Sequence, residues 1–243
     1  MIVNSLDPIP IESMKDFSAF EQSIGVTFTD KAILKQAFIH RSYINENPRS
    51  GLEHNERLEF LGDAVIELVV TDYLYRTYPS HHEGDLTAYR SALVNAVIMG
   101  EVATTLHMND YLLLSKGEQK DIGRARQTIL ANTYEAFVGA LYLDQGYAPC
   151  DVFVAQTLLA RLDDIIKTKS WKDAKSTVQE EAQERLGVTP SYKVIGEVGP
   201  DHDKHFTIGV FFGDKKIAEG KGKSKQEGEQ QAALAALEAK GWQ

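Results

Sequence analysis

Apolar residues recur with the period of an α-helix over the first two-thirds of the chain. The helices that this pattern predicts span residues 17–24, 32–39, 55–77, 85–106, 127–145 and 149–166. Thr29-Asp30 is expected to cap the second of them, and Gly146 to end the fifth in the left-handed conformation. Residues 41–54, rich in Asn, Pro and Gly, are expected to form a loop. The pattern therefore predicts an all-α domain over residues 15–166.

The periodicity changes after a polar stretch at residues 167–174, which we interpret as a linker. The elements expected beyond it are a helix at 176–186, strands at 192–197, 205–212 and 215–219, and a helix at 224–240. Ser224 and Glu227 have the spacing of a capping box at the start of the last helix. Residues 175–241 are thus predicted to form a small α+β domain in the order α-β-β-β-α.

Three acidic side chains share one face of the expected helix at 55–77. Glu56, Glu59 and Asp63 fall within about 60° of one another at 100° per residue. Apolar residues cover most of the rest of the helix, so the acidic stripe should lie at the edge of the core. Stacked acids repel one another, and partial burial raises the cost. A hard divalent cation with oxygen ligands would relieve this repulsion.

A second polar stripe occurs on the largely apolar helix at 127–145. Asn132 and Glu135 are three residues apart and therefore share a face. Two buried helices that present oxygen ligands to each other could assemble a Mg²⁺ site. The alternative for both stripes is a solvated acidic face balanced by Arg57 and nearby lysines. Glu67, one turn beyond Asp63, is better explained as an acid paired with a neighbouring base.

Composition is that of an ordinary globular protein, with 43% hydrophobic and 25% charged residues among 243. The single cysteine, Cys150, excludes an intrachain disulfide framework. The N-terminal residues lack the pattern of a secretory signal and the apolar runs are too short to span a bilayer, which favours the cytoplasm and no membrane association. The net charge of −9 argues against nucleic acid, but residues 172–243 are nearly neutral, with 11 Lys and Arg against 12 Asp and Glu.

Several motifs resemble one known family. HNERLEFLGDAV at 54–65 is similar to the signature of ribonuclease III, the double-stranded-RNA endonuclease. The later motifs follow in the family's order, namely HEGDLTAYRSALV at 82–94, LSKGEQ at 114–119 and ILANTYEAFVGALYLD at 129–144. The C-terminal element order, with GKGKSKQEGEQQAA at the last helix, resembles a double-stranded-RNA-binding domain.

The resemblance implies a nuclease domain whose metal-facing residues are Glu59, Asp63, Asn132 and Glu135, with Asp63 and Glu135 catalytic. Glu56 and Glu83 match further acidic positions of the family. The implied cofactor is Mg²⁺, with Mn²⁺ as a substitute, and the products would carry 5′-phosphate and 3′-hydroxyl ends. The family usually has Asp where this chain has Asn132, which leaves metal affinity and ion preference open.

The resemblance also implies partners. The residues matched to contacts with double-stranded RNA are Gln179, Glu180, His202, Lys221, Lys223 and Lys225. Gln226 and Gly228 replace the more usual Lys and Ala, which should weaken the phosphate clamp and the helix. Phe60 is either a core residue or, by the resemblance, a contact in a symmetric homodimer.

The function that these observations favour is a metal-dependent endoribonuclease that processes ribosomal precursors and other structured transcripts. The main alternative is a non-catalytic protein of the same fold that binds double-stranded RNA or the ribosome, an alternative that Asn132 alone supports. A metal-dependent hydrolase of small molecules is a third possibility, which the C-terminal domain makes improbable.

Overall fold

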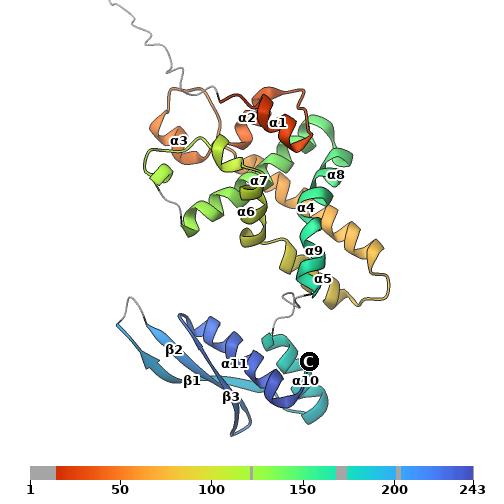
Figure 1. Cartoon of the computed structure of the whole chain (residues 1–243), viewed down its shortest axis with the longest axis vertical. Helices are drawn as coiled ribbons and strands as arrows, with labels where there is room; N and C mark the ends of the chain where they lie inside the picture. The colour runs from red at the N-terminus through yellow and green to blue at the C-terminus, as the bar shows by residue number, and fades with distance from the viewer. Residues whose placement is uncertain (1–14, 121–122, 168–173, 201–203, 243) are drawn as a thin grey trace, which may run out of the picture. The chain divides into compact units, whose positions relative to one another are not determined.

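The computed structural model describes residues 15–120, 123–167, 174–200 and 204–242. The chain divides into two compact units, Met1–Thr168 and Lys169–Gln243 (Figure 1). The first is helical, and the second is a three-stranded sheet with two helices. The predicted fold class, an all-α domain followed by a small α+β domain, is confirmed.

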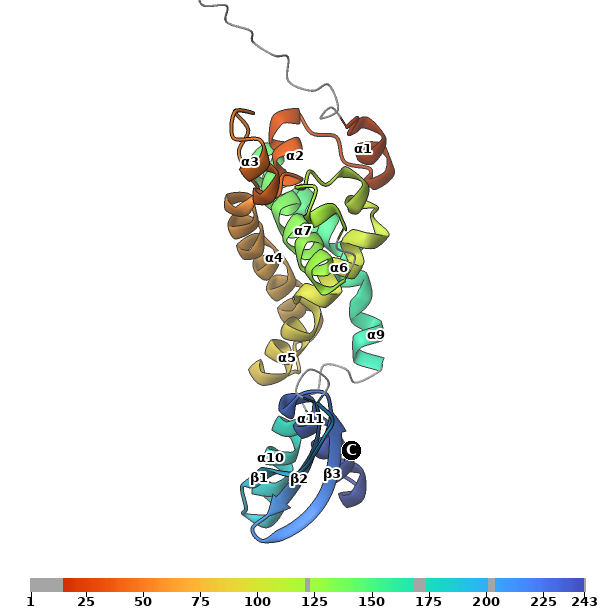
Figure 2. The same ribbon diagram turned by 90° about the vertical axis from the view of Figure 1, so that its left-hand side faces the viewer.

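The helices of the N-terminal unit are α1 (Ser18–Ile24), α2 (Lys31–Ala37), α3 (Arg41–Glu46), α4 (Glu56–Thr77), α5 (Glu83–Leu93), α6 (Ala96–Thr105), α7 (Arg124–Gln145), α8 (Tyr147–Thr157) and α9 (Leu162–Lys167). Short 3₁₀ turns occur at η2 (Met108–Tyr111), η3 (Glu118–Lys120) and η4 (Leu159–Arg161). The two longest helices, α4 and α7, have 22 residues each and pack against each other (Figure 2). They form the centre of this unit.

Three expectations about where helices occur and how far they continue were wrong. The predicted loop at 41–54 begins with α3, whose first turn is capped by the side chain of His40. The predicted helix at 85–106 is two helices, because Asn95 leaves the helical conformation and its side chain caps α6. The predicted helix at 149–166 is likewise divided into α8, η4 and α9. Polar side chains that bond to the backbone compete with helix continuation, which periodicity alone does not reveal.

The expected caps at Asp30 and Gly146 had different outcomes. Asp30 caps α2 by accepting hydrogen bonds from the N–H groups of Ala32 and Ile33 at 2.8 and 3.3 Å. Gly146 has the expected positive φ of 82°, but its ψ of −167° lies outside the left-handed helical region. The extended ψ lets α8 start at the next residue, so Gly146 connects two helices and does not form a simple cap.

Aromatic side chains fill the core between α7 and the N-terminal helices. Phe137 of α7 lies 5.7 Å from Phe20, 5.4 Å from Phe28 and 4.9 Å from Phe153, measured between ring centroids. These rings are at most 2% exposed. The predicted apolar character of α7 therefore reflects burial from several sides.

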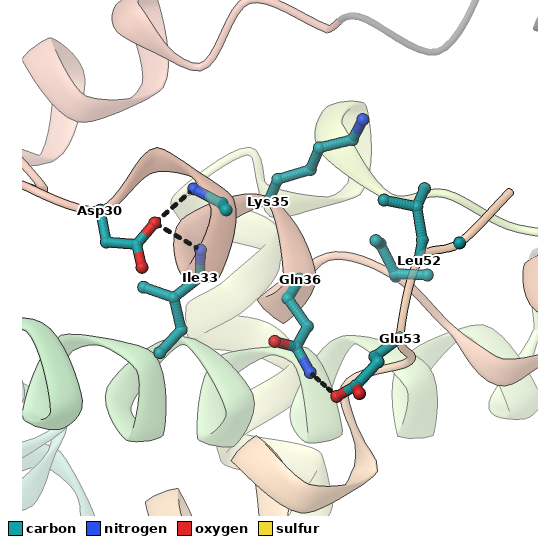
Figure 3. A pocket seen from close by; sticks show the side chains of 9 residues that line it. Asp30, Ile33, Lys35, Gln36, Leu52 and Glu53 are labelled. Atoms are coloured by element: carbon teal, nitrogen blue, oxygen red, sulfur yellow. Dashed lines mark hydrogen bonds between the residues drawn. The ribbon is translucent and has the colours of Figure 1, made fainter.

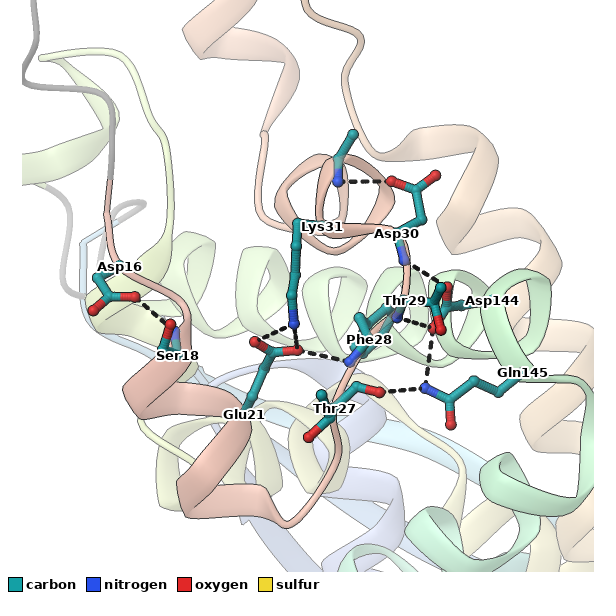
Figure 4. Close-up of polar contacts among 11 residues, drawn as sticks. Asp16, Ser18, Glu21, Thr27, Phe28, Thr29, Asp30, Lys31, Asp144 and Gln145 are labelled. Carbon is teal, nitrogen blue, oxygen red and sulfur yellow. Dashed lines mark hydrogen bonds and ion pairs between the residues drawn. The ribbon is translucent and has the colours of Figure 1, made fainter.

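Hydrogen bonds hold the segment before α2 against the end of α7 (Figure 4). The Asp144 carboxylate accepts the backbone N–H groups of Thr29 and Asp30, both at 2.8 Å. Burial opposes ionisation of Asp144, but these two N–H groups, the Gln145 side chain and the charge of Lys31 together hold its pKa below the usual value. On the other side of the segment, Glu21 accepts the Phe28 N–H at 2.7 Å and pairs with Lys31 at 2.6 Å. The carboxyl end of α7 is thus held in a fixed place.

The C-terminal unit has the order α10 (Ala174–Leu186), β1 (Pro190–Val198), β2 (His205–Phe212), β3 (Lys215–Gly222) and α11 (Lys225–Lys240). The sheet is antiparallel in the order β1-β2-β3. Ile208, Val210 and Phe212 of β2 share one face and form the core with α10 and α11. One half of the predicted capping box is present, since Ser224 accepts the Glu227 N–H at 3.1 Å. The Glu227 carboxylate reaches the N–H of Lys223 at 2.7 Å.

The predicted linker at 167–174 lies mostly outside the described residues. Its first residue, Lys167, ends α9, and its last, Ala174, begins α10. Across the described ranges, none of the helices combines the length and apolar character needed to cross a membrane.

Candidate active site

The candidate site forms where α4 and α7 cross with their backbones in contact. A Cβ added to Gly62 of α4 would lie 1.8 Å from the carbonyl oxygen of Glu135. A Cβ added to Gly139 of α7 would lie 2.1 Å from the carbonyl oxygen of Leu58. Neither helix could approach the other this closely with any larger residue at these positions. The two contacts also show that the helices run antiparallel.

This crossing brings the predicted metal-facing residues of both helices together. Glu59 and Asp63 flank Gly62 on α4, and Glu135 lies at the same level on α7. Burial raises the pKa of Glu135 to about 7, and the negative charges of Asp63 and Glu59 add to this effect. Burial and the charges of Glu56 and Asp63 also raise the pKa of Glu59, although a hydrogen bond from Asn132 opposes the rise. The four predicted residues are therefore electrostatic neighbours.

The crowded carboxylates fit a bound cation. In the described part of the chain, no Lys or Arg forms an ion pair with Glu59, Asp63 or Glu135, so the alternative of a face balanced by Arg57 is not supported. Oxygen ligands of this kind suit a hard divalent ion. Among the described residues, no three His, Cys, Asp or Glu side chains are placed so that they could hold one metal ion together. Binding would thus require carboxylate rotation.

The remaining acids of the first stripe have separate surroundings. Glu56 pairs with Arg41 at 3.3 Å and lies 3.7 Å from His54. Glu67 pairs with Arg90 at 3.0 Å, as expected of an acid with a neighbouring base. Glu83 begins α5, beyond the far end of α4, and accepts a hydrogen bond from Thr87 at 3.1 Å. Since α4 rises about 1.5 Å per residue, Glu83 lies far from Glu59 within one chain.

Phe60 is not a core residue. Its side chain is 81% exposed, although it follows Glu59 in a helix that is otherwise well packed. Leu68 and Tyr75 of the same helix are also exposed, by 57% and 73%. Large apolar side chains grouped on one exposed helix face suggest a surface that another molecule covers.

The pocket drawn in Figure 3 contains none of the predicted site residues. It has a volume of about 300 Å³ and lies between α2 and the segment Gly51–Leu52–Glu53, where Gln36 reaches Glu53 at 3.5 Å. The carboxylates of α4 and α7 instead lie along a helix crossing, with Asp63 exposed.

The predicted RNA contacts of the C-terminal unit lie on exposed positions. Gln179 and Glu180 are exposed on α10. The three lysines occupy successive elements, with Lys221 in β3, Lys223 before α11 and Lys225 at its first residue. The Lys225 amine lies 5.7 Å from the centre of the Phe206 ring. His202 lies outside the described residues.

Sequence reasoning missed two features that build the site. Gly62 and Gly139 lie within apolar helical runs, where glycine costs about 1 kcal/mol relative to alanine. Glycine retained within a helix despite this cost is a sequence signal that another backbone approaches closely there. Asn55, at the start of α4, is 2% exposed and donates to the carbonyl oxygen of Ala37 at 3.0 Å. It fixes the beginning of the helix that carries Glu56, Glu59 and Asp63.

Comparison with known proteins identifies the family of both units. Residues 30–162 match the family model "Ribonuclease-III-like", and residues 174–240 match "Double-stranded RNA binding motif". The chain is 45% identical over 220 residues to "Ribonuclease 3" of Carboxydothermus hydrogenoformans, covering 90% of this chain and 94% of that protein. It is 40% identical over 228 residues to "Ribonuclease 3" of Borreliella burgdorferi, covering 94% and 93%.

The helical unit is also similar to a solved structure. The nuclease domain of ribonuclease III from Campylobacter jejuni is 35% identical, with a TM-score of 0.53, over 58% of this chain and 94% of that one. A helical nuclease unit followed by a double-stranded-RNA-binding unit defines a class of RNA-cleaving proteins. This chain belongs to the ribonuclease III family and is an endoribonuclease of double-stranded RNA.

Proposed function

We propose that Glu59, Asp63, Asn132 and Glu135 hold a catalytic Mg²⁺, with Asp63 and Glu135 indispensable for cleavage. The raised pKa of Glu135, caused by burial and by the nearby Asp63 and Glu59, is the observation that supports this assignment most directly. Perturbed carboxylates of this kind concentrate at functional sites. Mn²⁺ has similar ligand requirements and is proposed as a substitute.

The chemistry is phosphodiester hydrolysis that leaves 5′-phosphate and 3′-hydroxyl ends. When bound, the metal ion makes hydroxide available near neutral pH and stabilises the negative charge of the transition state. Glu135 and Glu59 contribute their carboxylate oxygens once deprotonated, and Asn132 contributes an amide oxygen. Glu56, which Arg41 already neutralises in part, supports the site from its edge.

We assign duplex capture to the C-terminal unit. Lys221, Lys223 and Lys225 stand near the N-terminus of α11, where the helix dipole also favours phosphate. Gln179 and Glu180 on α10, together with His202, would contact the minor groove. Such contacts read A-form shape and 2′-hydroxyl groups more than sequence. Binding should therefore depend strongly on salt.

The working unit is proposed to be a homodimer that forms through the exposed face of α4. Phe60, Leu68 and Tyr75 lie within about 80° of one another around the helix. The Campylobacter jejuni structure is described as concerning a region involved in dimer formation of its nuclease domain. Two-fold symmetry matches the antiparallel strands of a duplex, with one site for each strand. A second chain is also the means by which Glu83 could approach a metal site.

The proposed substrates are structured precursors of ribosomal RNA and other transcripts with duplex regions, processed in the cytoplasm. Two relatives named "Ribonuclease 3" align with this chain over 93% and 94% of their own length, and this chain matches both a nuclease and a double-stranded-RNA-binding family model. A non-catalytic duplex-binding protein has only Asn132 in its favour, since the carboxylates at the crossing are all present.

Replacement of Glu135 tests the assignment. Glu135→Gln keeps the size of the side chain and removes its charge, so it should abolish Mg²⁺-dependent cleavage of a long RNA duplex and leave duplex binding unchanged. The matched control is Glu67→Gln, which removes a carboxylate of the same stripe that Arg90 already pairs. The control should cleave at a rate close to the wild type.

Two results would contradict the proposal. Full cleavage by Glu135→Gln would exclude a catalytic role for this residue. Cleavage by the wild type that is unaffected by removal of divalent ions would exclude the metal site as a whole.

A further inference from the structure

Gly62 and Gly139 fix the distance between the backbones of α4 and α7 at the point where these helices cross. Gly62 and Gly139 put backbone directly against backbone, without any side chain between the helices at this level. Most helix pairs are separated by 8–10 Å through interlocking side chains, and that distance adjusts when side chains change. Here the separation is set by atoms that cannot rotate away.

The residues proposed to hold metal lie within one turn of this contact. Glu59 and Asp63 are three residues before and one residue after Gly62, and Glu135 is the residue whose carbonyl oxygen faces Gly62. Any change in the separation of the two backbones at this level therefore changes the span between the carboxylates of α4 and Glu135. Rotation of the Glu59 and Glu135 side chains, which assembles the site in any case, starts from the backbone positions that this contact fixes.

The separation of ligands matters most for a small ion. Mg²⁺ requires oxygen atoms at about 2.0–2.1 Å in a nearly octahedral arrangement, whereas Ca²⁺ accepts about 2.3–2.6 Å and irregular geometry. A Cβ at Gly139 would lie 2.1 Å from the Leu58 carbonyl oxygen, and ordinary contact begins at 3.4 Å. The backbones would have to separate by more than 1 Å, which exceeds the difference between the two ions.

We propose that the Gly62–Gly139 crossing determines which ion the site accepts, by fixing how far the backbone that carries the ligands of α4 lies from the backbone that carries those of α7. The glycines are positioning residues in this scheme and make no contact with the metal. The inference rests on the metal site proposed above and adds a selectivity device to it.

The test compares Gly139→Ala with a matched glycine replacement elsewhere in the same domain. Gly100 of α6 also packs against α7, and a Cβ there would lie 2.7 Å from the carbonyl oxygen of Gln127. Gln127 precedes Glu135 by eight residues, about 12 Å along the helix. Gly100→Ala should therefore destabilise the domain in a similar way without altering the ligand span.

Binding is measured on the full chain without RNA. Mg²⁺ and Ca²⁺ are titrated separately against bound Mn²⁺, and free Mn²⁺ is followed by electron paramagnetic resonance. We expect Gly139→Ala to lose about tenfold or more in Mg²⁺ affinity, the range observed when groups that orient metal ligands are removed. Its Ca²⁺ affinity should change much less, so that the preference for Mg²⁺ over Ca²⁺ declines. Gly100→Ala should keep the wild-type preference.

Equal preference ratios in the wild type, Gly139→Ala and Gly100→Ala would overturn the inference, as would equal changes in both variants. If Gly139→Ala does not fold without metal, refolding becomes the measurement, because an ion that binds the folded state stabilises it. The ratio of the Mg²⁺ to the Ca²⁺ concentration that restores the helical circular dichroism signal should then exceed the wild-type ratio of the two dissociation constants, and an equal or smaller ratio or no recovery would overturn the inference. A wild type that binds none of these ions and cleaves without them would instead overturn the metal site itself.

Discussion

Glu135 lowers the stability of the metal-free protein at a position that is proposed to bind a metal ion. Its pKa of about 7 is raised first by burial and then by Asp63 and Glu59. Near neutral pH the metal-free protein therefore carries either a proton or an unfavourable charge at this position. Sites that bind metal through carboxylates accept this cost because the cation removes it. In the proposed metal site, this position would serve a bound cation at the expense of metal-free stability.

The pH dependence of stability should reveal this cost. The folded state binds the Glu135 proton more tightly than the unfolded state, whose pKa is near 4.5, so this residue makes metal-free stability fall as pH rises from about 4.5 to about 7. Glu135→Gln should melt at a higher temperature than the wild type at pH 8, with a difference that shrinks towards pH 4.5. Thermal unfolding in a chelator measures this. Glu53→Gln, which removes an exposed carboxylate from a loop, is the control.

Asn132 should limit metal affinity. Its amide donates a hydrogen bond to Glu59, a role that an ionised Asp cannot fill. Asn132→Asp would lose this bond and add a negative charge beside the cation. We expect a lower Mg²⁺ concentration for half-maximal cleavage and a lower melting temperature in chelator. An unchanged or higher Mg²⁺ requirement would show that Asn132 does not limit binding.

At the scale of elements, buried glycines in both domains allow two elements to approach each other closely. Gly228 of α11 appears from the sequence to weaken the helix, yet it is buried against the sheet. A Cβ there would lie 2.6 Å from Cγ1 of Ile208, which is 1% exposed and cannot move freely. The residue was predicted to cost helix propensity, and the structure shows what that cost permits, namely the close approach of α11 to β2.

Gly228→Ala should therefore fail to stabilise the C-terminal domain. The gain of about 1 kcal/mol in helix propensity is opposed by about 1–3 kcal/mol for overpacking. We expect an unchanged or lower urea midpoint for this domain. Gln226→Ala, an exposed replacement in the same helix, is the control and should be neutral or slightly stabilising. A clear gain in Gly228→Ala would show that α11 can shift without cost.

At the scale of the whole molecule, the exposed face of α4 is the observation on which the proposed homodimer rests. Phe60, Leu68 and Tyr75 present apolar surface that an isolated monomer would leave in water. Glu59 lies in the first turn of α4, whereas Glu83 begins α5 beyond the other end of α4, so in the proposed dimer these two acids would approach each other from different chains. Association and catalysis would then be linked through a single helix.

Phe60→Ala tests this link. Because the side chain is 81% exposed in one chain, its loss should spare the core of the domain and weaken association. Sedimentation velocity over a range of concentrations should show a shift towards monomer, with helical content retained. Val97→Ala, which shortens a 60% exposed side chain on α6, should leave association unchanged. Loss of folding without any change in association would contradict the interface.

The sequence by itself determined the two domains, the acidic stripes and the family. The stripe of Glu56, Glu59 and Asp63 follows from helical periodicity alone, as do the pair Asn132 and Glu135 and the helix cap at Ser224. These are local relations, in which residues three or four apart meet because of the helix itself. The motif order in the chain carried the family, and comparison with known ribonucleases confirmed it.

Only the tertiary structure decided what lies between elements. Periodicity identified neither the contact of Gly62 with Glu135 nor that of Gly139 with Leu58, because both join residues more than 70 positions apart. The same holds for the exposure of Phe60 and for the separation of Glu83 from Glu59. A local pattern states which face of a helix is polar, whereas the partner of that face depends on how the helices pack. The pKa of Glu135 arises from this packing, because burial and the charges of another helix together produce it.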